Sequence, residues 1–354
     1  MSLESLGADA TVHKFFQPYV ARGLVLARVA VSQCNHYHLF TATGELQAEA
    51  SGTLRYRTPG PAGMPVTGDW VAARVVDQWR AIVEVVLPRK TLFSRRAAGQ
   101  REDEQPVAAN IDVAFLVCGL DGDFNMRRLE RYMTLTAEAG VEAVVVLNKA
   151  DLCPDIEARL AEARAVARGA PVVSATTRTP DGLDAIRAFL AYGRTVALLG
   201  SSGVGKSAII NRLLGGERIR TNEVRASDSR GRHTTTRREL FPLAGGGAVI
   251  DTPGMRELQL WAGEESVEQT FDEIAEIGQS CRFRDCSHSG EIGCAVARAI
   301  AEGLLSEERV KSYRKLMAEV RRHEAMTDRA AMAERKKRDK AMARSIRAFF
   351  RQRH

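Results

Sequence analysis

One segment has the residue types and spacing of a phosphate-binding loop. It fits G-x-x-x-x-G-K-[ST], so the candidate contacts are Gly200, Ser201, Ser202, Gly203, Val204, Gly205, Lys206, Ser207 and the following Ala208. The glycines let backbone N–H groups turn toward phosphate oxygens, and Lys206 adds a positive charge for the outer phosphates. The Ser207 hydroxyl is suited to ligating Mg²⁺. The segment therefore predicts a site for a nucleoside triphosphate with Mg²⁺.

A second segment bears on which base is bound. Asn148, Lys149 and Asp151 form the pattern N-K-x-D directly after an apolar run typical of a buried strand. An Asp carboxylate can accept hydrogen bonds from both N1–H and the amino group of guanine, whereas adenine lacks this pair of donors. Ser174 and Ala175, after the next apolar run, are expected to support the base through a main-chain N–H. The pattern predicts specificity for guanine.

A third segment has the pattern D-x-x-G of a γ-phosphate sensor. Asp251 is expected to hold Mg²⁺ through water, and the N–H of Gly254 to meet the γ-phosphate. A Thr- and Arg-rich stretch lies between this pattern and the phosphate loop. One of its threonines should complete the Mg²⁺ shell, and Thr235 is favoured over its neighbours Thr234 and Thr236.

The residue after the D-x-x-G pattern bears on the rate of hydrolysis. It is Met255, which cannot orient a water molecule as the Gln of many small GTPases does. Slow intrinsic hydrolysis is therefore expected. His233 is the nearby candidate for orienting water or donating to developing charge, and it joins Lys206 and Thr235 as a predicted catalytic residue. The alternative is that His233 contacts RNA or solvent.

Four residues near the C-terminus have the types and spacing of a metal site. Cys281, Cys286, His288 and Cys294 follow the pattern C-x4-C-x-H-x5-C. Three thiolates and one imidazole complete a closed tetrahedral Zn²⁺ site with no position left for water, which makes such a site structural. The alternative is a set of reduced cysteines in a small helical domain.

The nucleotide-binding loops require a sheet to hold them. Residues 111–262 alternate buried apolar runs with amphipathic runs, which predicts a parallel α/β sheet with helices on both faces. The N-K-x-D pattern precedes the phosphate loop, the reverse of the order in ordinary small GTPases. We therefore expect a circularly permuted GTPase domain, in which D-x-x-G leads directly into the C-terminal region.

The sequence on either side of this domain divides into further parts. Residues 20–93 alternate apolar and polar positions in the runs LVLARVAV, HYHLFTA, GTLRYR, GDWVAARVV and AIVEVVL, which predict a five-stranded OB-type barrel. The polar stretch 94–110 is expected to be a linker. Residues 1–19 are an N-terminal extension, 263–325 a zinc-binding helical domain, and 326–354 a basic tail.

Charge and cysteine content limit the possible partners and compartment. The net charge of +7 is concentrated in residues 309–354, which hold 16 Lys and Arg against 5 Asp and Glu. This predicts a polyanionic partner, either nucleic acid or an anionic membrane surface, unless the charge serves solubility alone. Six cysteines are too few for a disulfide scaffold, and no apolar run is long enough to span a membrane. A cytoplasmic monomer is expected.

From about residue 20 to 320 the chain resembles the small ribosomal subunit biogenesis GTPases of the RsgA (YjeQ) family. The resemblance rests on GDWV, NKAD, VSA, GSSGVGKS, GRHTTT, DTPG and the C-x4-C-x-H-x5-C pattern. It implies GTP hydrolysis that is stimulated by the small ribosomal subunit during late maturation, with binding to rRNA, as a checkpoint or release switch. The alternative is an RNA-binding module that senses GTP and GDP with negligible turnover.

Overall fold

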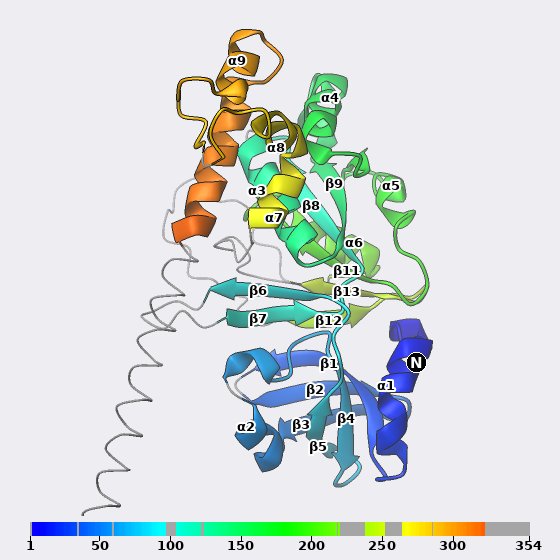
Figure 1. The fold of residues 1–354 in the computed structure, drawn as a ribbon. Coiled ribbons are helices and arrows are strands. Elements are labelled where there is room, and N and C mark those ends of the chain that lie inside the picture. The colour runs from blue at the N-terminus through cyan, green and yellow to red at the C-terminus, as the bar shows by residue number, and fades with distance from the viewer. Residues whose placement is uncertain are drawn as a thin grey trace, which may run out of the picture. The chain divides into compact units, whose positions relative to one another are not determined.

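The computed structural model describes residues 2–33, 35–58, 60–96, 104–121, 124–217, 219, 238–251, 264–284 and 286–322. The chain forms two compact units, residues 1–261 and 262–354 (Figure 1). Within the described ranges, no helix has the length and apolar character that crossing a membrane requires. Several predicted features lie outside these ranges: His233, Thr234, Thr235, Thr236, Gly254, Met255 and the tail.

The first unit contains a closed five-stranded barrel, as expected. Its strands are β1 (Val25–Gln33), β2 (His36–Thr41), β3 (Gly44–Ala50), β4 (Trp70–Val75) and β5 (Arg80–Val86). Strand β1 pairs with both β2 and β4, and the parallel pairing of β3 with β5 completes the closure. The interior is filled mainly by small and β-branched side chains, among them Ala27, Val29, Val71 and Val83. Small side chains suit so narrow a barrel.

The third strand differs from the expectation. The run GTLRYR, predicted as a strand, is the helix α2 (Gly52–Arg57), and the third strand is β3, which was not among the predicted runs. The Ser51 side chain accepts a hydrogen bond from the Leu54 N–H at 3.0 Å, so this residue caps the helix. Alternation over six residues was too short a signal to exclude one capped helical turn.

The stretch expected as a linker contains most of a strand pair. Strands β6 (Leu92–Arg96) and β7 (Glu104–Ala109) pair antiparallel. Phe93 and Val107 are buried. The sequence does not indicate this pairing, because the segment is mostly charged and polar and its few apolar residues lie at the start of β6 and the end of β7.

The rest of the first unit is an α/β sheet. Its strands are β8 (Val113–Gly119), β9 (Glu142–Asn148), β10 (Val172–Ser174), β11 (Thr195–Leu199), β12 (Glu239–Pro242) and β13 (Ala248–Asp251). The spatial order is β10-β9-β8-β11-β13-β12, with only the pairing of β12 to β13 antiparallel. The helices are α3 (Met126–Glu138), α4 (Ile156–Ala167), α5 (Asp184–Arg187) and α6 (Lys206–Leu213). Phe115 and Leu116 are successive residues of β8 and both are buried, so both faces of the sheet are covered.

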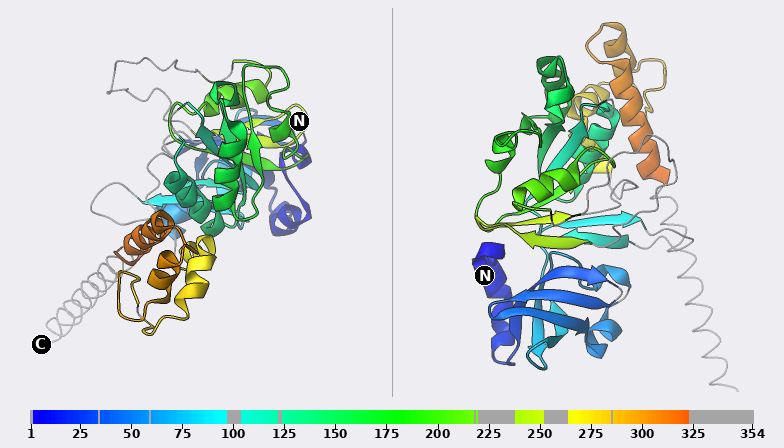
Figure 2. Two further views of the ribbon diagram at one scale, coloured as in Figure 1. Left: turned by 90° about the horizontal axis from the view of Figure 1, so that it is seen from above. Right: turned by 180° about the vertical axis from the view of Figure 1, so that it is seen from behind.

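Strand β12 joins the α/β sheet to the barrel. It pairs antiparallel with β1 through Val31 and Glu239, so one continuous sheet runs from β10 into the barrel. Figures 1 and 2 show β12 and β13 between the barrel and the other α/β strands.

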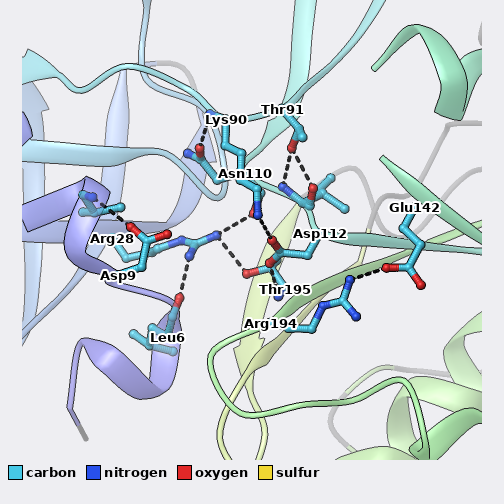
Figure 3. Close-up of polar contacts among 12 residues, drawn as sticks. Leu6, Asp9, Arg28, Lys90, Thr91, Asn110, Asp112, Glu142, Arg194 and Thr195 are labelled. Atoms are coloured by element: carbon cyan, nitrogen blue, oxygen red, sulfur yellow. Dashed lines mark hydrogen bonds and ion pairs between the residues drawn. The ribbon is translucent and has the colours of Figure 1, made fainter. Parts of the chain in front are cut away.

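The N-terminal extension packs at the same junction. It forms a short 3-10 turn (Glu4–Leu6) and the helix α1 (Ala10–Val20). The buried Arg28 guanidinium donates hydrogen bonds to the carbonyl oxygens of Leu6 at 2.5 Å and Asn110 at 3.0 Å, and to Thr195 Oγ1 at 3.0 Å (Figure 3). Burial lowers the pKa of Arg28 to about 10, so the side chain is still a cation at neutral pH. One charged side chain thus ties together the extension, the barrel and the α/β sheet.

The second unit is helical. It contains α7 (Glu264–Thr270), α8 (Asp272–Gly278), α9 (Ala295–Ala301) and a helix over residues 307–322. Its core includes Phe271 and Tyr313, whose rings meet edge to face at 5.6 Å between centroids. The loop between α8 and α9 carries the Cys and His pattern.

Candidate functional site

The predicted phosphate loop connects β11 to α6 at the carboxyl edge of the sheet. Gly200 and Gly205 have positive φ angles of 156° and 97°. A Cβ atom on Gly200 would lie 2.4 Å from the Val117 carbonyl oxygen, and one on Gly205 would lie 2.3 Å from Asn148 Nδ2. Only glycine fits both positions. The loop therefore winds closely around the N-terminus of α6, where backbone N–H groups and the helix dipole favour an anion.

Two cations lie on this loop. Lys206 Nζ donates to the carbonyl oxygens of Gly200 at 2.7 Å and Ser201 at 2.6 Å. Arg128, from the first turn of α3, donates to Ser201 Oγ. Sequence patterns did not indicate Arg128, because its contact depends on a segment 73 residues away.

The N-K-x-D segment is bonded directly to the phosphate loop. Asn148 Nδ2 donates to the Val204 carbonyl oxygen at 2.7 Å, and Lys149 Nζ donates to that of Gly203 at 2.7 Å. Lys149 also forms an ion pair with Asp121. The structure thus brings together two patterns that are more than fifty residues apart in the chain.

The third member of this pattern, Asp151, lies beside the Ser174 and Ala175 segment. Its Oδ1 accepts a hydrogen bond from Thr176 Oγ1 at 2.5 Å. The Ala175 N–H donates to the Leu147 carbonyl oxygen at 2.9 Å, so this N–H belongs to the sheet in the structure. Thr176, which the sequence reasoning missed, is the donor placed against the Asp151 carboxylate.

Asp251 is the last residue of β13 and is buried. Strand β13 runs parallel to β11, which leads into the phosphate loop. Because the carboxyl ends of parallel strands meet at one edge, the carboxylate of Asp251 and Ser207 at the start of α6 belong to the same edge of the sheet. A cavity of about 580 Å³ lies alongside α6, and the predicted contact residue Ala208 is part of its lining.

In the second unit, the four predicted metal ligands come together. The ligand atoms of Cys281, Cys286, His288 and Cys294 all lie within 4.8 Å of one another. Cys281 Sγ is 3.9 Å from Cys294 Sγ, and each of these two sulfurs is 3.6 Å from His288 Nδ1. Tetrahedral Zn–S bonds of about 2.3 Å place sulfurs about 3.8 Å apart. The cluster is consistent with zinc.

The pKa values within the cluster shift in different directions. Burial acts to raise the pKa of Cys281, but hydrogen bonds from the Ala295 and Val296 N–H groups and from the other two thiols leave it below its usual value. Burial raises the pKa of Cys286 to about 12, so this thiol needs a nearby cation to ionise. Burial lowers the pKa of His288, which keeps the imidazole neutral and able to ligate.

A groove lined by cations runs beside the cluster. Its volume is about 550 Å³, and its basic lining residues are Lys311, Arg314, Lys315 and Arg321, all on the exposed face of the helix over 307–322. Ser287 and Ser289 also line the groove. The Ser287 hydroxyl and the N–H groups of Ser287 and Ser289 donate to Glu291, which holds the pKa of that carboxyl at about 2.

A sheet that carries the N-K-x-D segment before the G-x-x-x-x-G-K-[ST] loop, joined to a barrel and followed by a Cys3His cluster, defines a circularly permuted GTPase. A family model described as RsgA GTPase matches residues 86–261. The chain is 46% identical over 329 residues to the small ribosomal subunit biogenesis GTPase RsgA of Opitutus terrae, covering 90% of each chain. It is 40% identical over 352 residues to that of Syntrophotalea carbinolica, covering 97% of this chain and 96% of the relative. The chain belongs to the RsgA family of small ribosomal subunit biogenesis GTPases, as its sequence predicts.

Solved structures share this fold. The crystal structure of YjeQ from Thermotoga maritima matches with a TM-score of 0.62 and 25% identity, covering 84% of this chain and 98% of that one. YloQ, described as a circularly permuted GTPase, matches with a TM-score of 0.60 and 24% identity, covering 84% and 95%. The fold predicted from the sequence, a barrel, a permuted GTPase domain and a Cys3His helical domain, is confirmed.

Proposed function

We propose that this chain binds GTP with Mg²⁺ at the carboxyl edge of its α/β sheet and hydrolyses it to GDP and phosphate while bound to the small ribosomal subunit. The observation that carries this proposal is the hydrogen bond between Asn148 and the Val204 carbonyl, because it joins the base loop to the phosphate loop. Hydrolysis should be slow in the free protein and faster on the subunit.

The donor set fits a nucleotide. The phosphate loop offers backbone N–H groups and the Lys206 ammonium to the phosphates. The Ser207 hydroxyl and the Asp251 carboxylate offer oxygen atoms suited to Mg²⁺, and Thr235 remains the favoured third magnesium ligand. Bound Mg²⁺ would neutralise charge on the phosphates. The buried Asn148 Oδ1 has no hydrogen-bond partner within the described ranges, as expected of a site that a ligand or water completes.

We expect Asp151→Asn to change base preference. The carboxylate can accept from two guanine donors, whereas an amide accepts at one atom and donates at the other, which suits the carbonyl of xanthine. GTP affinity should fall by about tenfold or more, at about 1.5–3 kcal/mol for a hydrogen bond to a charged group. Xanthosine triphosphate should bind more tightly to the variant than to the wild type. Competition binding with both nucleotides measures this change.

Asp155→Asn is the matched control for that substitution. Asp155 caps α4 by accepting from the Ala158 N–H at 3.0 Å, a role that Asn performs equally well. Its nucleotide preference should be that of the wild type. If ATP competes as well as GTP for the wild-type protein, the assignment of Asp151 to guanine recognition is wrong.

We propose further that the groove of the second unit contacts RNA phosphates on the small subunit. Its four cations, Lys311, Arg314, Lys315 and Arg321, lie on the exposed face of one helix, with the small Ala318 between Lys315 and Arg321. Phosphate oxygens spaced along a strand are a natural complement to such a row. The Arg314 guanidinium donates to Ser289 Oγ at 2.7 Å, so part of the row is already oriented.

We expect Arg314→Ala combined with Lys315→Ala to weaken binding to the small subunit and to flatten its salt dependence. Each lost phosphate contact should reduce the slope of log affinity against log salt by about 0.7–0.9. Co-sedimentation with small subunits over a salt series measures the slope. Arg298→Ala, which removes an exposed cation of α9 paired with Glu302, is the control. An unchanged slope in the double variant would show that the groove contacts no phosphate.

Turnover is the direct test of the proposed function. GTP hydrolysis is measured with the protein alone, with small subunits and with large subunits. Stimulation by small subunits only is the expected result. Equal rates in all three reactions would contradict an activity tied to the small subunit, and negligible turnover in all three would favour a GTP-sensing RNA-binding module.

A further inference from the structure

The barrel contacts the strands that carry the magnesium-side carboxylate. The contact is made by residues 67–70, which we call the GDW turn: Thr67, Gly68, Asp69 and Trp70. The Thr67 side chain is fully buried, and its Oγ1 donates to the Arg238 carbonyl oxygen at 3.3 Å, immediately before β12. The GDW turn therefore holds the strand through which the α/β sheet enters the barrel.

Gly68 brings the same turn against β13. Its φ angle is 91°, and a Cβ atom there would lie 2.2 Å from the Ala109 carbonyl oxygen and 3.1 Å from Ile250 Cδ1. Ile250 directly precedes Asp251 in β13. The absence of a side chain at Gly68 allows the turn to approach the end of this strand closely.

Buried polar contacts fix the shape of the GDW turn. The Asp69 carboxylate accepts hydrogen bonds from Arg89 Nε and Nη2, both at 2.8 Å, and from the Val66 N–H at 2.8 Å. Asn110 Nδ2 donates to the Gly68 carbonyl oxygen at 3.0 Å. The Arg28 guanidinium lies 4.8 Å from the Trp70 ring centroid. A turn held in this way is a rigid support for the strands that rest on it.

The strand register carries this support to Asp251. Val31 of β1 pairs with Glu239 of β12, and Glu239 pairs in turn with Asp251 of β13. These three residues form one row across three strands. Glu239 is the first residue of β12, so any movement of this end of the strand moves the residue that pairs with Asp251.

We propose that Thr67 is a positioning residue for GTP hydrolysis: its hydroxyl anchors β12, and β12 sets the position of the Asp251 carboxylate. This inference rests on the proposed function, in which Asp251 serves the Mg²⁺ side of the nucleotide. On this proposal the barrel contributes to GTP hydrolysis by fixing the position of Asp251.

Three variants test the inference. Thr67→Val keeps the shape and removes the hydroxyl, and Thr67→Ser keeps the hydroxyl. Thr41→Val is the matched control, because Thr41 is another buried threonine of the barrel whose hydroxyl donates to a backbone carbonyl, that of Gly44 at 2.7 Å. Thr41 is the last residue of β2, a strand that does not pair with β12.

The readouts are kcat and KM for GTP with small subunits, and the Mg²⁺ concentration that gives half-maximal rate. Thr67→Val should lower kcat about three- to tenfold and raise the Mg²⁺ requirement, with GDP affinity unchanged. Thr67→Ser and Thr41→Val should match the wild type. Equal kinetics of Thr67→Val and Thr41→Val would overturn the inference.

Amide hydrogen exchange provides a readout that does not depend on GTP hydrolysis. Thr67→Val should speed exchange at Glu239–Pro242 and Ala248–Asp251, and Thr41→Val should not. Unchanged exchange in these strands overturns the inference even if the protein hydrolyses GTP as proposed. If Thr67→Val does not fold, Thr67→Ala is measured in the same way, since its smaller side chain removes the hydroxyl without adding bulk.

Discussion

Lys206→Ala should abolish GTP-dependent function while leaving the fold intact. In the structure the Lys206 ammonium is held by two carbonyl oxygens of its own loop and makes no contribution to the apolar core. In the proposed complex it would bond two phosphate oxygens. Each hydrogen bond to a charged group is worth about 1.5–3 kcal/mol, so GTP affinity should fall by about 10²- to 10⁴-fold. Binding of a fluorescent GTP analogue measures this loss.

Lys90→Ala is the control for Lys206→Ala. Lys90 is also a lysine of the first unit with a charged partner, Asp112, at 2.7 Å, but it lies at the junction with the barrel (Figure 3). It should bind GTP like the wild type. Both variants should keep the wild-type thermal unfolding temperature within a few degrees. Wild-type GTP affinity in Lys206→Ala would contradict the phosphate-loop assignment.

The parts of the molecule that the sequence predicted best are those encoded locally. The phosphate loop needs glycine at Gly200 and Gly205 for steric reasons that hold wherever such a loop occurs, so its pattern is readable without the fold. The spacing from Cys281 to Cys294 likewise lies within one loop. The β-strands of the α/β sheet were readable because each is a continuous apolar run covered on both faces.

The parts that sequence reasoning missed depend on contacts between distant segments. Arg128 reaches Ser201 and Thr176 reaches Asp151 only because the sheet places their loops at one edge. No local pattern marks either residue. The buried Arg28 at the junction is similar, since a lone arginine in an alternating strand reads as a solvent-facing residue until its partners are known.

The remaining large effect concerns the metal cluster. We expect the chain to bind one Zn²⁺, and we expect Cys281→Ser to unfold the second unit while the first unit still binds GTP. The loop that carries the ligands has few apolar side chains. The ring centroid of His288 lies 6.1 Å from that of Tyr313, which belongs to the helical core. Structural zinc sites contribute about 10–16 kcal/mol of binding free energy in zinc-finger peptides. Loss of one ligand should therefore remove a large share of this unit's stability.

Metal analysis together with thermal unfolding, followed separately for the two units, tests this expectation. Cys153→Ser makes the same chemical change at a half-buried thiol of the first unit and should keep both the zinc and the unfolding profile. Below neutral pH, protons compete with zinc for the thiolates and for His288. Because burial lowers the pKa of His288, protons compete with zinc for this imidazole only at more acidic pH. A metal-free protein with an unchanged second unfolding transition would show that the helical core, and not the metal, holds this unit together.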